Sequence, residues 1–202
     1  MRVIAGLYKG RILHAPKGVM LRPTLDNVKE ALFNIIGEGI QGARVLELFA
    51  GSGALGIEAL SRGAARVTFV DNNIRCIKAI DENLNTLRIN KLNQAKLVRM
   101  DAMRAVGFLS TKDEKFDIVI LDPPYCKDTA PHKGQRPFVG GAKKCLQALA
   151  DCDILTPCVL VIIEHYKKDL LPNSAGELSC LRSETYGDTV LSFYNLHSSV
   201  QK

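Results

Sequence analysis

Four consecutive residues, Asp122-Pro123-Pro124-Tyr125, carry the groups needed to prepare the exocyclic amine of a nucleobase for methylation. The lone pair of such an amine is delocalised into the ring, so acceptors must first hold its hydrogens. The Asp122 carboxylate and the Pro123 carbonyl can supply these acceptors, and Tyr125 offers a face on which a base can stack. Two prolines with fixed φ angles stiffen the segment. The alternative is a stiff turn that leaves the preceding apolar run, Phe116–Leu121.

A glycine-rich turn earlier in the chain indicates a nucleotide-containing cofactor. Gly51, Gly53 and Gly56 fit the pattern G-x-G-x-x-G between a predicted strand and a predicted helix, and Asp71 follows Gly51 by twenty residues. An acid at that spacing can hold ribose hydroxyls. The spacing alone fits a dinucleotide as well as S-adenosylmethionine.

Charge distinguishes these two cofactors. Glu47, Asp71, Asp101 and Asp122 each lie at or just beyond the carboxyl end of one of the first four predicted strands, the edge at which ligands bind in open sheets. Four carboxylates suit the sulfonium cation of S-adenosylmethionine and would repel the pyrophosphate of NAD. Singly, each acid has a structural alternative: Asp101 could cap a helix, and Glu47 could pair with a lysine.

The alternation of short β-branched runs with amphipathic stretches predicts an α/β fold in which a parallel sheet carries helices on both faces. The predicted strands are Arg44–Phe49, Arg66–Val70, Ala95–Arg99, Phe116–Leu121 and Cys158–Glu164. The predicted helices between them are Ala54–Arg62, Asn73–Ile89, Ala102–Leu109 and Gly140–Ala150.

Both ends of the chain depart from this rhythm. Leu178–Glu184 and Thr189–Leu196 predict a terminal antiparallel hairpin, which gives seven strands with an antiparallel last strand. Thr24 is predicted to cap a helix that reaches about Ile36. Residues 1–21, interrupted by glycines, are predicted to form a small β-hairpin appendage on a main domain of residues 22–202.

The length of the chain fits a single domain, and its positive net charge indicates a polyanionic partner. The chain has 202 residues, a net charge of +6 and a pI near 9.0. Its six cysteines form no C-x-x-C pair and its histidines no metal-like spacing, so neither a metal site nor a disulfide framework is expected. With no secretory signal and no apolar stretch long enough to cross a bilayer, the chain is expected to be soluble and cytoplasmic. A monomer is the expected oligomeric state.

These motifs together resemble class I S-adenosylmethionine-dependent methyltransferases that act on amines, and more narrowly the bacterial RsmD family. The first resemblance rests on Glu47–Gly56, Asp71 and Ile120–Tyr125. The narrower one rests on the segments Arg2–Gly6, Lys9–Arg11, Leu21–Thr24, Asp26 with Val28–Asn34, and Phe49–Gly63. The resemblance implies a Rossmann-like fold and methylation of N2 of a guanine in small-subunit ribosomal RNA.

The resemblance also implies roles for individual residues. It places the methionine part of the cofactor against Phe49, Gly51, Ser52 and Gly53, the ribose on Asp71 with Asn72 beside it, and the adenine near Asp101 and Ala102. It places the target amine at Asp122 and Pro123 beneath Tyr125, next to Pro124. The segment Arg22-Pro23-Thr24 would close over the cofactor.

Two groups of basic residues could contact RNA phosphates. Every charged residue before Asp26 is positive: Arg2, Lys9, Arg11, Lys17 and Arg22. The second group lies in or beside the long segment after Tyr125 and consists of Lys127, Lys133, Arg136, Lys143 and Lys144. Phosphate contacts fix position without reading sequence. The alternative is an ordinary solvated surface.

Other functions stay open at this point. The same motif could bind N6 of adenine in DNA or RNA, because it contacts the amine and does not distinguish the ring that carries it. A NAD-dependent oxidoreductase is disfavoured by Glu47, and a non-catalytic RNA-binding module by the intact Gly51, Asp71 and Asp122. If the substrate is ribosomal RNA, it could be naked or within an assembling small subunit.

Overall fold

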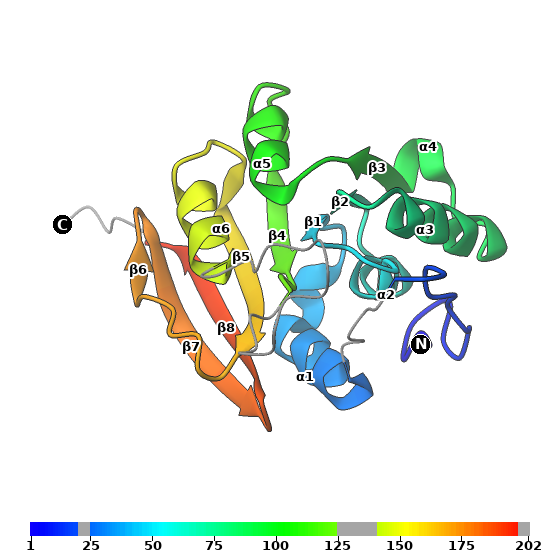
Figure 1. The fold of residues 1–202 in the computed structure, drawn as a ribbon, viewed down its shortest axis with the longest axis horizontal. Helices are drawn as coiled ribbons and strands as arrows, with labels where there is room; N and C mark the ends of the chain where they lie inside the picture. The colour runs from blue at the N-terminus through cyan, green and yellow to red at the C-terminus, as the bar shows by residue number, and fades with distance from the viewer. Residues whose placement is uncertain (20–24, 125–140, 198–202) are drawn as a thin grey trace.

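The computed structural model describes residues 1–19, 25–124 and 141–197. Its centre is a mixed sheet with strand order β3-β2-β1-β4-β5-β8-β7-β6 (Figure 1). The first five strands in that order are parallel and the others join antiparallel. The predicted fold class is therefore confirmed.

The strand bounds agree closely with the predicted ones, with two differences. They are β1 Arg44–Leu48, β2 Arg66–Asp71, β3 Ala95–Arg99, β4 Phe116–Leu121, β5 Leu155–Tyr166, β6 Ser174–Ala175, β7 Leu178–Tyr186 and β8 Thr189–Leu196. Strand β5 starts before the predicted Cys158, across an irregularity in its pairing with β4. Strand β6 was not predicted, because two residues show no alternation.

Helices cover both faces of the sheet (Figure 1). They are α1 Asp26–Ile36, the 3-10 helix η1 Gly37–Ile40, α2 Ala54–Ser61, α3 Ile74–Thr86, α4 Lys91–Gln94, α5 Ala102–Ser110 and α6 Gly141–Ala150. Helix α3 ends before the predicted Ile89, because Arg88 has a positive φ of 57°. At the start of α1 the N-cap residue is Leu25, with no side-chain cap. The predicted cap, Thr24, lies outside the described residues.

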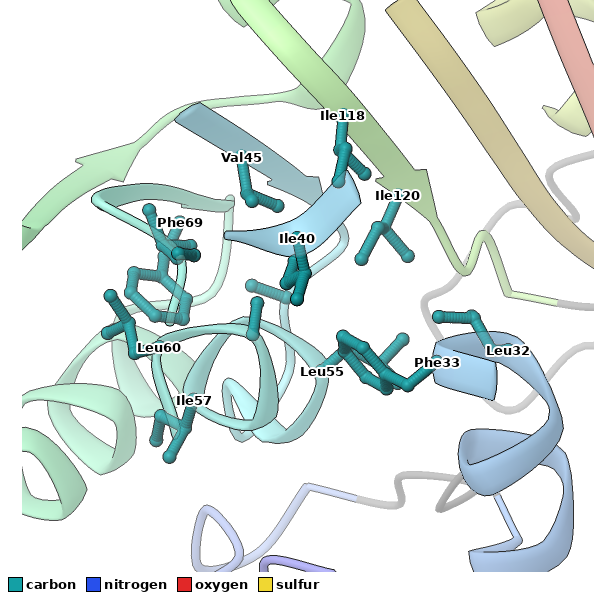
Figure 2. Close-up of a cluster of buried hydrophobic side chains, with 14 of the residues drawn as sticks. Leu32, Phe33, Ile40, Val45, Leu55, Ile57, Leu60, Phe69, Ile118 and Ile120 are labelled. Atoms are coloured by element: carbon teal, nitrogen blue, oxygen red, sulfur yellow. The ribbon is translucent and has the colours of Figure 1, made fainter. Parts of the chain in front are cut away.

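Two apolar layers hold the helices to the sheet. Figure 2 shows the layer on the α1 and α2 side, where Phe33 and Leu55 face Val45 of β1 and Ile118 of β4. On the opposite face, α5 and α6 pack against the alternate residues of the same strands, such as Leu46 and Val119. The strands are buried on both faces, as is usual in parallel sheets, and because they run parallel their carboxyl ends lie at one edge of the sheet.

The first thirteen residues, here called the N-terminal arm, fold back on themselves and pack on the domain. A single antiparallel bridge joins Arg2 to Ile12. Val3 and Leu13 are buried in the same apolar layer as α1 and α2. The predicted boundary between residues 21 and 22 lies outside the described residues, and the division into appendage and main domain stays a prediction.

Candidate active site

The carboxyl ends of β1 and β4 lie level with each other, and this brings the two motifs together. Leu48 pairs with Leu121 across these adjacent parallel strands. The residues that follow, Phe49 and Asp122, therefore leave the sheet side by side. Asp122 is half-buried, Pro123 is buried and Pro124 is exposed. Tyr125 lies outside the described residues, so its stacking role stays a prediction.

The turn after β1 has the backbone conformation that its glycines predict. Gly51 and Gly53 have φ of 55° and 75°, and even Phe49 has φ of 60°. A side chain is rarely tolerated there. A Cβ on Gly53 would also lie 3.1 Å from Ile80 Cγ1. The turn therefore packs closely on α3 and leads directly into α2.

Asp71 fastens this turn to the next element. At the end of β2, its Oδ2 accepts a hydrogen bond from Gly51 N at 2.9 Å and its Oδ1 accepts one from Asn73 N at 2.8 Å. Each carboxylate oxygen can accept more than one hydrogen bond. Asp71 can thus hold the glycine turn in place and still receive ribose hydroxyls, the role predicted for it together with Asn72.

Asp101 serves as the N-cap of α5. Its Oδ1 accepts hydrogen bonds from Met103 N at 3.0 Å and Arg104 N at 3.3 Å, so the structural alternative is present in the molecule. Strand β1 pairs with β2, and β2 pairs with β3, both in parallel register. Asp101, just after the end of β3, therefore lies at the edge that carries Asp71. A contact of Asp101 and the buried Ala102 with adenine stays a prediction.

Glu47 does not take the place at the edge that its position in the chain predicts. Its side chain is buried beneath α2, where Oε2 accepts a hydrogen bond from Gly56 N at 3.0 Å. Gly56 permits this approach, because a Cβ there would lie 2.6 Å from that oxygen. Burial raises the pKa of Glu47 to about 8, against the lowering effect of the backbone hydrogen bonds. The carboxyl is therefore mostly protonated at neutral pH, and the charge argument for a cation rests on the three aspartates.

We expect Glu47→Gln to flatten the pH dependence of stability. The folded protein keeps this proton up to about pH 8, whereas the unfolded chain releases it near the ordinary 4.5. Between these values the folded state binds more protons, so the free energy of unfolding of the natural protein falls as pH rises. Urea unfolding at pH 5 and pH 8 should show a smaller drop for the Glu47→Gln variant. An equal drop in both proteins would contradict the buried, protonated carboxyl.

Asn83 is a buried side chain near the site that the sequence interpretation missed. From α3, its Nδ2 donates to Ser52 O of the glycine turn at 3.1 Å and to His14 O at 3.0 Å, and its Oδ1 accepts from His14 N at 2.8 Å. An asparagine on the apolar stripe of a helix, beside Ile80 and Leu84, is the signal that could have found it.

The predicted RNA-contacting residues fall into three situations. Arg2 forms an ion pair with Asp26, with 3.0 Å between Nε and Oδ2. Lys9 and Arg11 are exposed on the N-terminal arm, and Lys17 is exposed just after it. Lys143 and Lys144 are exposed on α6, whereas Arg22, Lys127, Lys133 and Arg136 lie outside the described residues.

The described part of the chain shows no cluster of three potential metal ligands. Among the same residues, no helix has the length and apolar character needed to span a bilayer.

Comparison with known proteins identifies the family. The family model described as "Conserved hypothetical protein 95" matches residues 1–195. The chain is 41% identical to the Bacillus subtilis protein named "Putative rRNA methyltransferase YlbH", over 96% of this chain and 98% of that one. It is 34% identical to the Escherichia coli "Ribosomal RNA small subunit methyltransferase D", over 96% of this chain and 89% of the relative.

A solved structure agrees with these relatives. The Escherichia coli protein described as "Putative methyltransferase yhhF" superposes with a TM-score of 0.76 at 32% identity, covering 97% of each chain. The glycine turn, Asp71 and the Asp-Pro-Pro segment meet at one sheet edge in a chain that matches the family model almost throughout. The chain belongs to the RsmD/YlbH family of S-adenosylmethionine-dependent rRNA methyltransferases.

Proposed function

We propose that this enzyme transfers a methyl group from S-adenosylmethionine to the exocyclic N2 amine of a guanine in 16S ribosomal RNA. The observation that carries the proposal is the level pairing of Leu48 with Leu121. It sets the start of the glycine turn beside Asp122 and so allows a methyl donor and an amine to meet. Support for the substrate comes from the name of the Escherichia coli relative, a small-subunit rRNA methyltransferase.

The residues of this edge fit the methyl donor. The turn at Gly51–Gly53 offers backbone close to a ligand, and Asp71 offers carboxylate oxygens for hydroxyls. The half-buried carboxylates of Asp71, Asp101 and Asp122 favour a cation at this edge. S-adenosylmethionine supplies an electrophilic methyl carbon, so one N–C bond forms while one S–C bond breaks and the nitrogen loses a proton to solvent water.

The chain's own part in the reaction is to hold and orient the amine. Asp122 and the carbonyl of Pro123 accept hydrogen bonds from its two N–H groups, and this directs the nitrogen lone pair out of the ring plane. Positioning of this kind can contribute on the order of 7–11 kcal/mol to lowering the barrier. Asp122 acts chiefly as a hydrogen-bond acceptor that orients the amine, because both oxygens of an ionised carboxylate can accept hydrogen bonds.

A single assay tests the substrate. Ribosomal RNA from a strain that lacks the enzyme is incubated with the protein and labelled S-adenosylmethionine, and the modified nucleoside is identified by mass spectrometry. N2-methylguanosine in the small-subunit RNA is the expected product. N6-methyladenosine would instead support the alternative amine, which the Asp122-Pro123 segment could hold in the same way.

Asp71→Ala should weaken binding of S-adenosylmethionine by about tenfold or more, because the change removes both the ribose acceptor and the hydrogen bond to Gly51 N. Isothermal titration measures the effect, and NAD should give no heat with either protein. Asp81→Ala is the matched control, since Asp81 is a partly exposed acid on α3 paired with Lys91. Equal affinity for the Asp71→Ala variant and its control would remove Asp71 from the site.

A further inference from the structure

A hollow away from the proposed methylation site lies between the N-terminal arm and the end of α3. It has a volume of about 490 Å³, within the range of small-molecule and nucleotide sites. One wall belongs to the arm and the other to the residues where α3 ends. The lining residues are Leu7, Tyr8, Arg11, Thr86, Leu87 and Arg88.

The arm wall is held in place by hydrogen bonds to the end of α2. Leu7 N donates to Ser61 O at 2.7 Å, and Tyr8 N donates to Ser61 Oγ at 2.9 Å. Tyr8 also packs partly against the apolar core. The hollow is thus formed before any ligand arrives, which lowers the entropic cost of binding.

The charges that line this hollow are all positive. Arg11 and Arg88 are exposed, and within the described ranges neither guanidinium forms an ion pair. By contrast, Arg2 and Arg62 are paired with Asp26 and Glu58. Among the described residues that line the hollow there is no carboxylate. Two unpaired guanidiniums on facing walls suit a phosphate, which accepts hydrogen bonds from both.

Arg88 is held in a backbone conformation that costs energy. Its φ of 57° lies in the left-handed region that glycine or asparagine normally occupies at a helix end. Arg88 N donates to Asn85 O, and Ile89 N donates to Leu84 O, both at 3.0 Å, so the turn is closed on each side. A strained non-glycine residue kept at such a position is a reason to look for a role of its side chain.

Apolar and aromatic groups complete the hollow. Leu7 is 79% exposed at its rim, and the Tyr8 ring is half-buried beside it. We propose that this hollow binds one nucleotide of the RNA substrate away from the methylated base, with its phosphate between Arg11 and Arg88 and its base against Tyr8. The proposal rests on the proposed function in taking the substrate to be RNA.

The first test removes one charge without altering the turn. Arg88→Asn keeps a residue type that tolerates the left-handed region. Arg66→Gln is the control, because Arg66 is exposed and lines a different hollow with Arg44 and Phe116. Fluorescence anisotropy with a labelled single-stranded RNA of about 12 nucleotides gives the affinity over a series of salt concentrations.

Arg88→Asn should weaken RNA binding about fivefold to tenfold at low salt and reduce the salt slope by about 0.7, the effect of one lost phosphate contact on a single strand. In methylation assays, KM for ribosomal RNA should rise while kcat and the affinity for S-adenosylmethionine stay unchanged. If the Arg88→Asn variant matches the Arg66→Gln control while the natural protein binds and methylates RNA, the hollow is not an RNA site and the proposed function stands. A natural protein that neither binds nor methylates RNA would overturn both.

A second test moves the arm wall instead of the charge. Gly6 and Gly10 both have positive φ, 78° and 82°, but a Cβ on Gly6 would lie 1.8 Å from Ser61 O, whereas a Cβ on Gly10 meets no atom of the described residues within 4 Å. Gly6→Ala should therefore unseat the arm and lower RNA affinity at least as much as Arg88→Asn, and Gly10→Ala should have a smaller effect. Adding Arg88→Asn to Gly6→Ala should change little further. Equal affinities for the two alanine variants would overturn the two-walled site.

Discussion

Replacing Asp122 by alanine is expected to lower the rate of methyl transfer by at least about 100-fold while the affinity for S-adenosylmethionine remains close to that of the natural protein. The carboxylate follows β4 at the point level with the glycine turn. Its proposed contact is with the amine, whereas the turn is fastened by Asp71 through Gly51 N. The loss should therefore fall on kcat.

A matched control exists in the same strand. Asp117 lies near the other end of β4, where its Oδ2 accepts a hydrogen bond from Arg44 N at 2.8 Å and pairs with the Arg44 guanidinium. Asp117→Ala should leave the methylation rate intact. Asp122→Asn should be intermediate, because the amide keeps one acceptor oxygen and loses the charge. Single-turnover methylation with saturating methyl donor measures all three variants, and a near-normal rate for Asp122→Ala would refute its role.

The parts of the site that could be predicted are those placed by the end of the strand that precedes them in the chain. The turn at Gly51–Gly53 and the acid at the end of β2 follow from motif spacing, since parallel strands bring their carboxyl ends to one edge. The order of β1 beside β4 also places Asp122 near the turn. These features need only the strand ends, which periodicity locates to within a few residues.

The orientation of Glu47 was not predicted, for a reason visible in its own strand. Along β1, Val45 and Glu47 alternate with Leu46 and Leu48. Because side chains of a strand alternate between faces, Glu47 shares the face of Val45, which α2 covers. Position near the strand end suggested the ligand edge, whereas the alternation places the carboxyl beneath the helix.

The seating of the N-terminal arm could not be predicted because it depends on contacts between distant parts of the chain. Asn83 binds His14, the residue directly after the arm, from 69 residues away, and Ser61 binds Tyr8 of the arm from 53 residues away. Local spacing indicates a glycine-broken basic segment and nothing about the surface on which it packs. Sequence patterns report on residues that are close together in the chain. Features fixed by local spacing could therefore be predicted, and the packing of the arm on the domain could not.

The largest expected loss of stability comes from Glu58→Ala. Glu58 is fully buried on α2 and accepts hydrogen bonds from Ile4 N at 2.7 Å, Ala5 N at 3.0 Å and Arg62 Nε at 2.8 Å. The Nζ of Lys29, which is also buried, lies 3.8 Å from it. Alanine would leave two backbone N–H groups without their acceptor, and the buried Lys29 ammonium, which donates to Arg2 O, without its counter-ion. Breaking a buried pair in this way costs about 3–5 kcal/mol, and the N-terminal arm should detach from α2.

The pH dependence of this loss should identify Lys29 as its cause. Burial lowers the pKa of Lys29 in spite of the attraction of Glu58, and removing Glu58 should lower it further. Between the lowered pKa of Lys29 in the folded protein and its ordinary value of 10.5, the unfolded chain then binds more protons than the folded one, so the free energy of unfolding of the variant should rise with pH across that interval. Urea unfolding at pH 7 and pH 9.5 measures this recovery, with Glu30→Ala, an exposed acid on α1, as the control. A loss below about 1 kcal/mol at pH 7, no larger than that of an exposed ion pair, would show that Glu58 does not anchor the arm.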